Sequence, residues 1–335
     1  MRAARTQNKA LDLLVSLCTL WISCGFFLDA WAHGHVPVET FFTPYHGVFY
    51  SGMLALFAVL AAFRKRIPSS YRLALLGIPV FLLSGIGDLI WHRLLGVEEG
   101  VDALLSPTHQ GLGLGIFLLS SGPISSALRA RGQLRTLADQ LPLIFSLATW
   151  IELIHFGTAY AFDPAAGRVN APPSTHAFTP DYLTAITMGY YKTGTGVLIV
   201  LFQSAIVAGF ALFAGTRFAL APGALTLLYL LGNFAAAAAF TNDTPLLATV
   251  LIMSAAAGIA GDLIVTRFRP APDGGPAYRL LGVAVPAIYF ATYFVTTQAF
   301  GGVWWDWNIV LGATLWAGAI GFGLTLLAPG RAQRA

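Results

Sequence analysis

Two segments of this 335-residue chain each combine one aspartate with two histidines at matching spacings. In both, an Asp-x3-His pattern is followed by a short connecting segment and then by Ser/Thr-Pro-x-His. The residues are Asp29, His33 and His46 in the first copy and Asp88, His92 and His109 in the second. Two imidazoles and one carboxylate can bind copper, iron or zinc and leave open coordination positions for water, oxygen or substrate. The spacing therefore predicts two metal-ligating groups and leaves the choice of metal open.

Helix periodicity explains how each group would assemble. Residues four apart share a helical face, so Asp29 and His33 lie one turn apart, as do Asp88 and His92. A Ser or Thr before Pro is typical of a helix N-cap, with the proline at the first helical position. This start places the next histidine on the first turn of the following helix. Each pair of helices would form a hairpin that gathers one carboxylate and two imidazoles, and the hairpin occurs twice as an internal repeat.

Two interpretations without a metal stay open for these residues. They could form a metal-free proton relay, or they could be polar residues at a membrane interface. Ionisable residues at membrane depth are costly and usually functional. Their recurrence in two matching copies favours a bound metal.

The elements that must position these residues are transmembrane helices. Apolar residues make up 56% of the chain and charged residues 10%, whereas a soluble domain has about 25% charged residues. Long uninterrupted apolar runs indicate helices rather than a barrel. We therefore predict an all-α, polytopic transmembrane bundle of about ten spans. The expected spans are 11–32, 44–63, 73–93, 107–128, 138–160, 190–213, 219–240, 244–265, 280–300 and 308–327.

The distribution of charge predicts the orientation of this bundle. All but three of the 19 Lys and Arg residues fall on one side of the predicted map, the exceptions being Arg93, Arg168 and Lys192. Because cytoplasmic loops carry the excess of basic residues, we expect both termini in the cytoplasm. All seven histidines fall on the other side. The metal cluster is then extracytoplasmic in a multi-pass protein of the inner cell membrane. No aqueous domain remains that could bind nucleic acid.

The first copy resembles a known family. Asp29-x3-His33 followed by Glu39-Thr-Phe-Phe-Thr-Pro-Tyr-His46 is similar to the C subunit of the copper membrane monooxygenases, which oxidise methane or ammonia. The resemblance covers about residues 25–115. It implies that Asp29, His33 and His46 bind copper within the membrane.

The second copy resembles the same family less closely. That family has a further copper site built from Asn-x3-His and a later histidine. Asp88, His92 and His109 resemble this set, with Asp88 in place of Asn and a longer gap before His109. The resemblance makes copper the favoured metal over iron or zinc. It implies a copper-dependent monooxygenase, or a subunit of one, that acts on a small lipid-accessible substrate together with partner subunits.

Three acidic or imidazole side chains could support the ligands. Glu39 lies in the first outer loop, and Glu152 and His155 share a helical face near the outer end of the fifth span. They could be extra ligands or partners that orient an imidazole through its other nitrogen. We expect residues 1–135 to form the metal-binding hairpins and 136–335 a supporting bundle. A proline-rich outer loop over about 162–189 is expected to cap the outer face.

Two other functions stay open beside a membrane metalloenzyme. A transporter or metal-handling protein would require polar residues that continue inward along facing helices, and the sequence offers few. A haem held by two histidines would not need the aspartates. Membrane lipids surround the protein in every case.

Overall fold

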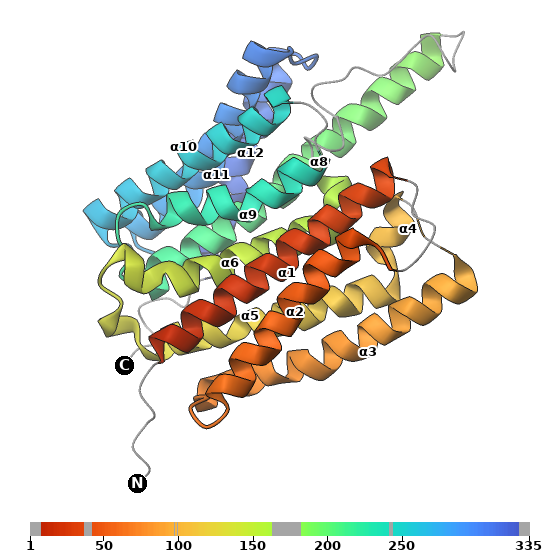
Figure 1. Cartoon of the computed structure of the whole chain (residues 1–335). Coiled ribbons are helices and arrows are strands. Elements are labelled where there is room, and N and C mark those ends of the chain that lie inside the picture. Colours follow the sequence, from red (N-terminus) through yellow and green to blue (C-terminus); the bar gives the residue numbers. More distant parts are fainter. Residues whose placement is uncertain are drawn as a thin grey trace. The chain divides into compact units, whose positions relative to one another are not determined.

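The computed structural model describes residues 8–36, 42–96, 98, 100–162, 182–240 and 244–327, and every regular element in these ranges is helical. Figure 1 shows their arrangement. The long helices are α1 (Lys9–His35), α2 (Pro44–Phe63), α3 (Arg72–Leu95), α5 (Pro107–Arg129), α6 (Leu137–Gly157), α8 (Tyr182–Arg217), α9 (Ala224–Phe240), α10 (Thr244–Phe268), α11 (Pro276–Phe300) and α12 (Trp307–Leu326). The short elements are η1 (Ser69–Tyr71), α4 (Gly100–Leu105), η2 (Arg131–Gln133) and η3 (Ala159–Ala161).

Each of the ten predicted segments corresponds to one of these long helices. Within the described part of the chain, nine helices are long and apolar enough to cross a membrane. The exception is α9, which has 17 residues. At 1.5 Å per residue it spans only about 25 Å, short of the roughly 30 Å of bilayer hydrocarbon.

One predicted boundary is wrong. Helix α8 begins at Tyr182, whereas a loop was expected as far as about residue 189. The last proline of this segment is Pro180, and no proline follows it to interrupt a helix over 182–189. The helix therefore extends further than hydropathy alone indicates.

The structure confirms the predicted helix starts at Pro44 and Pro107. The hydroxyl oxygens of Thr43 and Ser106 accept hydrogen bonds from backbone N–H groups of the first turn. Each proline occupies the position where a missing N–H costs nothing. These caps fix where α2 and α5 begin and therefore where their histidines lie.

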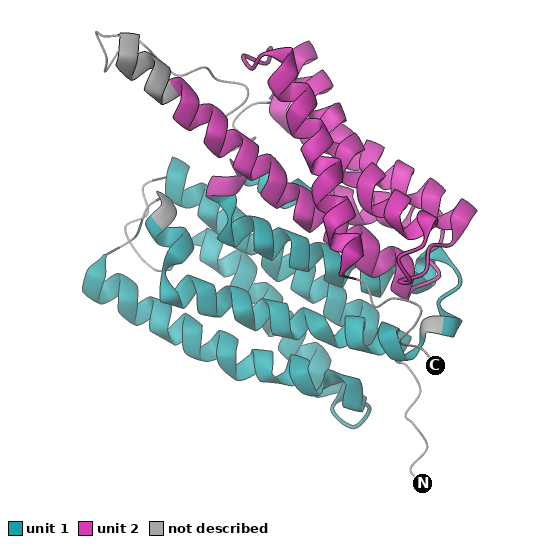
Figure 2. Ribbon diagram, turned by 180° about the vertical axis from the view of Figure 1, so that it is seen from behind, with its two compact units in different colours: residues 1–159, 231–239 teal, residues 160–230, 240–335 magenta. Residues whose placement is uncertain are grey.

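The chain divides into two compact units (Figure 2). Unit 1 comprises Met1–Ala159 and Leu231–Ala239, and unit 2 comprises Tyr160–Leu230 and Phe240–Ala335. Unit 1 extends past residue 135 because α6 packs against α1 and α5. Both predicted metal-ligating groups lie in unit 1.

Close helix contacts in unit 1 depend on glycine. A Cβ atom on Gly25 of α1 would lie 2.7 Å from backbone atoms of Phe49 on α2. On the neighbouring pair, a Cβ on Gly77 of α3 would lie 2.6 Å from the carbonyl oxygen of Gly115 on α5. Small residues let transmembrane helices approach closely. The α1–α2 and α3–α5 pairs are thus held tightly enough to share polar sites at their ends.

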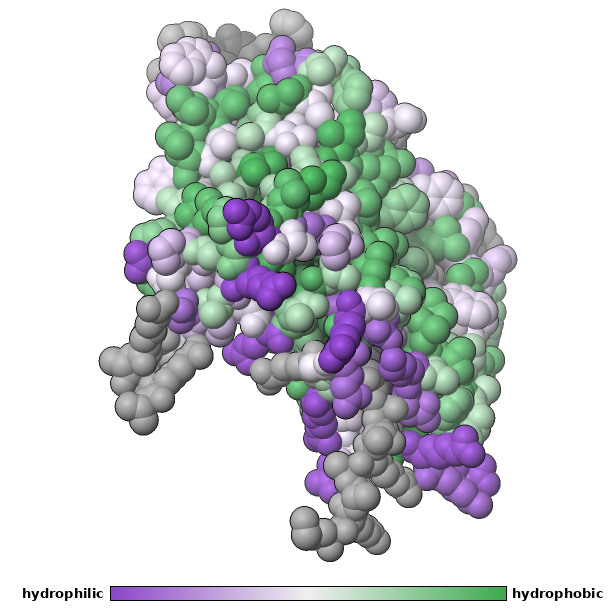
Figure 3. Space-filling model, turned by 90° about the vertical axis from the view of Figure 1, so that its left-hand side faces the viewer, coloured by the Kyte–Doolittle hydropathy of each residue, from purple (hydrophilic) through white to green (hydrophobic). Residues whose placement is uncertain are grey.

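The outer surface is apolar, as lipid contact requires. Large side chains such as Leu54 on α2 and Leu83 on α3 are more than two-thirds exposed. Figure 3 shows hydrophobic residues over much of one face, with hydrophilic residues gathered toward its lower part. Exposed leucines on successive helices fit a hydrocarbon solvent rather than water.

Candidate metal centre

The first triad consists of Asp29, His33 and His46. Asp29 Oδ2 lies 3.5 Å from His33 Nε2 and 3.3 Å from His46 Nε2. Asp29 and His33 come from the last turns of α1, and His46 comes from the first turn of α2. The structure therefore brings together all three residues expected in the first copy.

The second triad consists of Asp88, His92 and His109. Asp88 Oδ2 lies 3.5 Å from His92 Nε2, and its Oδ1 lies 3.2 Å from His109 Nε2. Asp88 and His92 are on the last turns of α3, and His109 is on the first turn of α5. In each triad, one potential ligand atom per residue lies within 4.8 Å of the other two. Each triad could hold a metal ion.

Local structure orients the histidines on the first turns of α2 and α5. The backbone N–H of His46 donates to Thr43 Oγ1 at 3.1 Å, and the backbone N–H of His109 donates to Ser106 Oγ at 3.4 Å. The Nδ1 atom of His46 also lies 3.2 Å from Thr43 Oγ1. The N-cap residue thus fixes both the helix start and the position of the imidazole.

Hydrogen bonds in the second triad identify which nitrogen of each ring carries a proton. His92 Nδ1 donates to the carbonyl oxygen of Gly96 at 3.3 Å, and His109 Nδ1 donates to that of Ala103 at 2.6 Å. A carbonyl oxygen can only accept, so Nδ1 carries the proton in both rings. Each Nε2 then points at Asp88 with either a lone pair or a second proton. A cation at the centre satisfies both nitrogens and the carboxylate together.

Buried atoms without hydrogen bonds support the same conclusion. Both ring nitrogens of His33 and the Oδ2 atom of Asp88 are buried and have no hydrogen-bond partner among the described residues. Leaving buried polar atoms unpaired is costly. The residues present therefore fit a bound metal ion.

The two triads are neighbours in unit 1. The rings of His33 and His92 stack with centroids 6.2 Å apart and an angle of 17° between their planes. One ring comes from α1 and the other from α3. The two sets of ligands thus face each other across a short distance, which the sequence could not establish.

A cavity of about 550 Å³ borders the first triad at His46. Its wall is mainly apolar and includes Phe81, Leu82 and Ile86. Tyr50 also lines it and lies close enough to the Asp29 and Asp88 carboxylates to interact electrostatically with both. The volume falls within the range typical of small-molecule sites.

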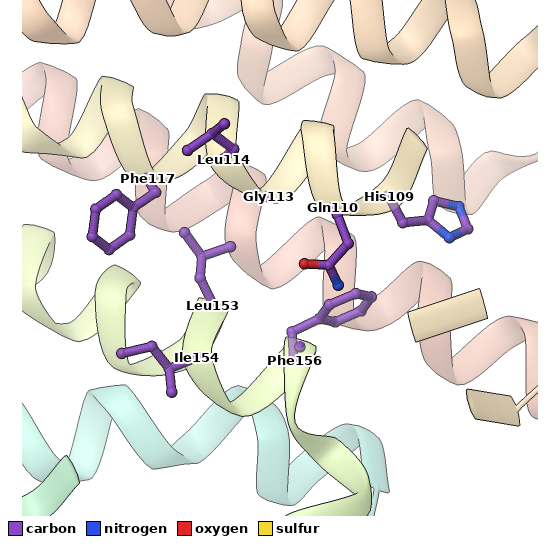
Figure 4. A pocket seen from close by; sticks show the side chains of 9 residues that line it. His109, Gln110, Gly113, Leu114, Phe117, Leu153, Ile154 and Phe156 are labelled. Atoms are coloured by element: carbon purple, nitrogen blue, oxygen red, sulfur yellow. The ribbon is translucent and has the colours of Figure 1, made fainter. Parts of the chain in front are cut away.

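A smaller cavity of about 230 Å³ lies between α5 and α6 beside His109. In Figure 4, Gln110 extends toward Phe156, while the His109 ring points away from Leu114 and Phe117. Each triad therefore has a cavity next to one of its histidines: His46 on the first turn of α2, and His109 on the first turn of α5. The larger one borders the first triad.

The three predicted supporting residues have different outcomes. Glu39 lies outside the described residues. Glu152 lies beside Ser23 of α1, and His155 Nε2 donates to Asn233 Oδ1 at 2.8 Å. Neither belongs to the two triads.

Sequence reasoning missed Glu98. One of its carboxylate oxygens lies 4.0 Å from His109 Nδ1, and the other accepts a hydrogen bond from Trp91 Nε1 at 2.5 Å. A signal was present in the sequence, because Glu98 follows His92 by the same six residues that separate Glu39 from His33. The repeated pattern is therefore Asp-x3-His-x5-Glu.

Comparison with protein-family models, with curated proteins and with solved structures gives no match. The resemblance to the copper monooxygenases therefore stays a prediction. The evidence on function comes from the two triads and the cavities beside them.

Proposed function

We propose that this chain is a membrane metalloprotein that holds two metal ions, one in each triad, for oxidative chemistry on a small apolar substrate. The observation that carries the proposal is the pair of facing Asp-His-His triads next to an apolar cavity. Copper is the favoured metal because the ligands suit it and the first triad resembles a copper site. Iron and zinc are the alternatives that metal analysis would identify.

The protein's own groups have separate roles in this proposal. Asp29 and Asp88 each supply the one negative charge of their triad, and the imidazoles supply neutral nitrogen donors. Backbone carbonyls and N-cap hydroxyls hold the rings in orientation, which tunes a metal site as much as its ligands do. A bound copper ion would supply one-electron redox chemistry at an open coordination position.

The 550 Å³ cavity is the proposed substrate site. Leu82 and Ile86 line it and are also exposed on the outside of unit 1, at 44% and 58%. A small apolar molecule dissolved in the bilayer could therefore reach His46 without crossing water. Apolar walls favour such a substrate through the hydrophobic effect. Tyr50 would place a phenol group at the wall of this cavity, within electrostatic range of both carboxylates.

The proposal also includes the side of the membrane on which the triads lie. We propose that the triads lie at the extracytoplasmic side of the inner membrane, because the positive-inside rule assigns the side rich in basic residues to the cytoplasm. Partner subunits are expected if the likeness to the monooxygenases extends to assembly. An electron donor must then reach unit 1 from that side.

Metal analysis of the purified full-length protein tests the proposal. We expect about two ions per chain in the wild type, and about one in either His33→Ala or His92→Ala, because each triad loses a ligand. His35→Ala is the matched control, since His35 is an exposed imidazole on the same helix that stacks on Trp31 outside both triads. Equal and negligible metal in wild type and variants would overturn the proposal. A Soret absorption band would identify haem instead.

A further inference from the structure

Glu152 is a buried carboxyl group on α6 in unit 1. It is 1% exposed, and its Oε2 atom has no hydrogen-bond partner among the described residues. No salt bridge reaches it in that part of the chain; its neighbours on α1 are Ser23 and Cys24. Ser23 Oγ is also buried, and the Ser23 side chain interacts with the Glu152 carboxyl group. Acidic residues at membrane depth are costly and usually functional.

A row of polar side chains on α1 leads to this carboxyl group. We name Asp12, Ser16, Thr19 and Ser23 the α1 polar stripe. Their spacings of four, three and four residues place them on one helical face, and each is fully buried. Ser16 and Thr19 donate to backbone carbonyls one turn earlier on α1. From the sequence, we expected few polar residues to continue inward along the helices, although a transporter would require them. For α1 this expectation is wrong.

The first residue of the stripe, Asp12, is itself buried but lies one helical turn from the surface. Tyr71 Oη donates to Asp12 Oδ1 at 2.7 Å. Lys9, one turn before Asp12, pairs with Asp139 at 2.6 Å and is 60% exposed. The stripe therefore runs from the helical turn next to this ion pair to the α1 residues beside Glu152.

Aromatic rings separate Glu152 from the triads. The rings of Phe26 and Phe156 stack at 4.1 Å, and Phe26 also packs edge-on against the His109 ring at 6.3 Å. Phe156 follows Glu152 by one turn of α6. Glu152 is thus reached along the stripe from the Lys9 end, with apolar rings on the side of the metal centre.

We propose that Glu152 exchanges protons with the aqueous phase at the Lys9–Asp139 end through the α1 polar stripe. On protonation, an O–H bond forms on the Glu152 carboxylate while the O–H bond of the donor beside it breaks. Each hydroxyl of the stripe accepts a proton on one side and releases its own on the other. Side chains one helical turn apart are about 5–6 Å from each other, so each transfer requires a water molecule between them. The exchange involves no redox step and does not depend on a bound metal.

A proton is the species that this site fits best. Burial without a cation favours the uncharged acid over the carboxylate. The other titratable groups near Glu152 among the described residues are Cys24 on α1 and His155 on α6. Asn233, which faces His155, is neutral. Each can be changed separately from Glu152.

Infrared difference spectroscopy on the full-length protein in liposomes tests the proposal. When the pH falls from alkaline to neutral, the wild type should gain a carboxylic-acid C=O band that shifts in D₂O, and Glu152→Gln should lack it. Asp262→Asn is the matched control. Asp262 is a buried acid of α10 whose oxygens accept hydrogen bonds from the N–H groups of Leu225 and Thr226 and from the Thr226 hydroxyl.

Two further variants keep the test decisive. Glu152→Asp should show the band that Glu152→Gln lacks, because it keeps a carboxyl group. A merely structural role of Glu152 would not require this result. Ser16→Ala combined with Thr19→Val should slow the appearance of the band without removing it. A band that persists in Glu152→Gln, or an unchanged rate in the double variant, would overturn the proposal. A response to Na⁺ at constant pH would also overturn it, since the site would then bind a metal cation.

Discussion

The two triads use the same residue types but are held differently. Thr108 donates a hydrogen bond to Asp88 at 2.8 Å, and both histidines of the second triad donate to backbone carbonyls. In the first triad, Tyr45 occupies the position that corresponds to Thr108, and neither nitrogen of His33 has a hydrogen-bond partner among the described residues. Within the described residues, the second triad is therefore held by more hydrogen bonds than the first.

This difference shows how two similar sets of ligands can serve different functions. A triad whose ligands are already oriented binds metal without ordering cost, because outer hydrogen bonds fix ring direction and basicity. A less constrained triad adjusts more easily when its coordination changes. The first triad is also the one that borders the larger cavity. We infer that the second triad holds metal more tightly and that the first faces the substrate.

The largest expected effect comes from removing a carboxylate. Asp88→Ala and Asp29→Ala should each reduce the metal content from about two ions to about one per chain, because three protein ligands are the usual minimum for such a site. Asp102→Ala, an exposed acid of α4, should change nothing. Elemental analysis after size-exclusion chromatography provides the measurement. Loss of both ions from either variant would show that the triads are not separate sites.

A smaller effect is expected from the residue that distinguishes the triads. Thr108→Val removes the hydrogen bond to Asp88 and should weaken metal binding at the second triad about 10–100-fold, the usual effect of losing such a partner. Tyr45→Phe is the matched change in the first triad and should have no effect. Competition with a chelator of known affinity measures both. Equal losses in the two variants would contradict the comparison.

The smallest effect concerns the order in which acid releases the metals. Protons compete with metal for imidazole and carboxylate, so binding weakens as the pH falls. The first triad should release its ion at a higher pH than the second. Acid titration of Asp29→Ala and Asp88→Ala, each holding one ion, separates the two curves. Release in the reverse order would contradict the assignment of the tighter site.

Local sequence signals were sufficient for the starts of α2 and α5 and for each triad taken alone. The start of α2 follows from Thr43 and Pro44, because an N-cap hydroxyl and a proline without an N–H both favour that position. Asp29 and His33 share a face because four residues make about one turn. These inferences concern residues close in sequence, where helix geometry leaves few alternatives.

Contacts between distant residues could not be predicted in this way. The stacking of His33 on His92 depends on how α1 and α3 are placed in unit 1, which no local pattern determines. The α1 polar stripe was visible as a spacing, but its burial against Glu152 depends on the packing of α1 and α6. Glu98 was overlooked because its role rests on the path of a loop rather than on helix periodicity.

Anomalous X-ray scattering at the copper edge, measured on crystals of the copper-loaded protein, tests the central claim most directly. The account predicts two anomalous peaks in unit 1, one among Asp29, His33 and His46 and one among Asp88, His92 and His109. Peaks confined to other histidines, such as His35 or His155, or no peak in either triad, would contradict it.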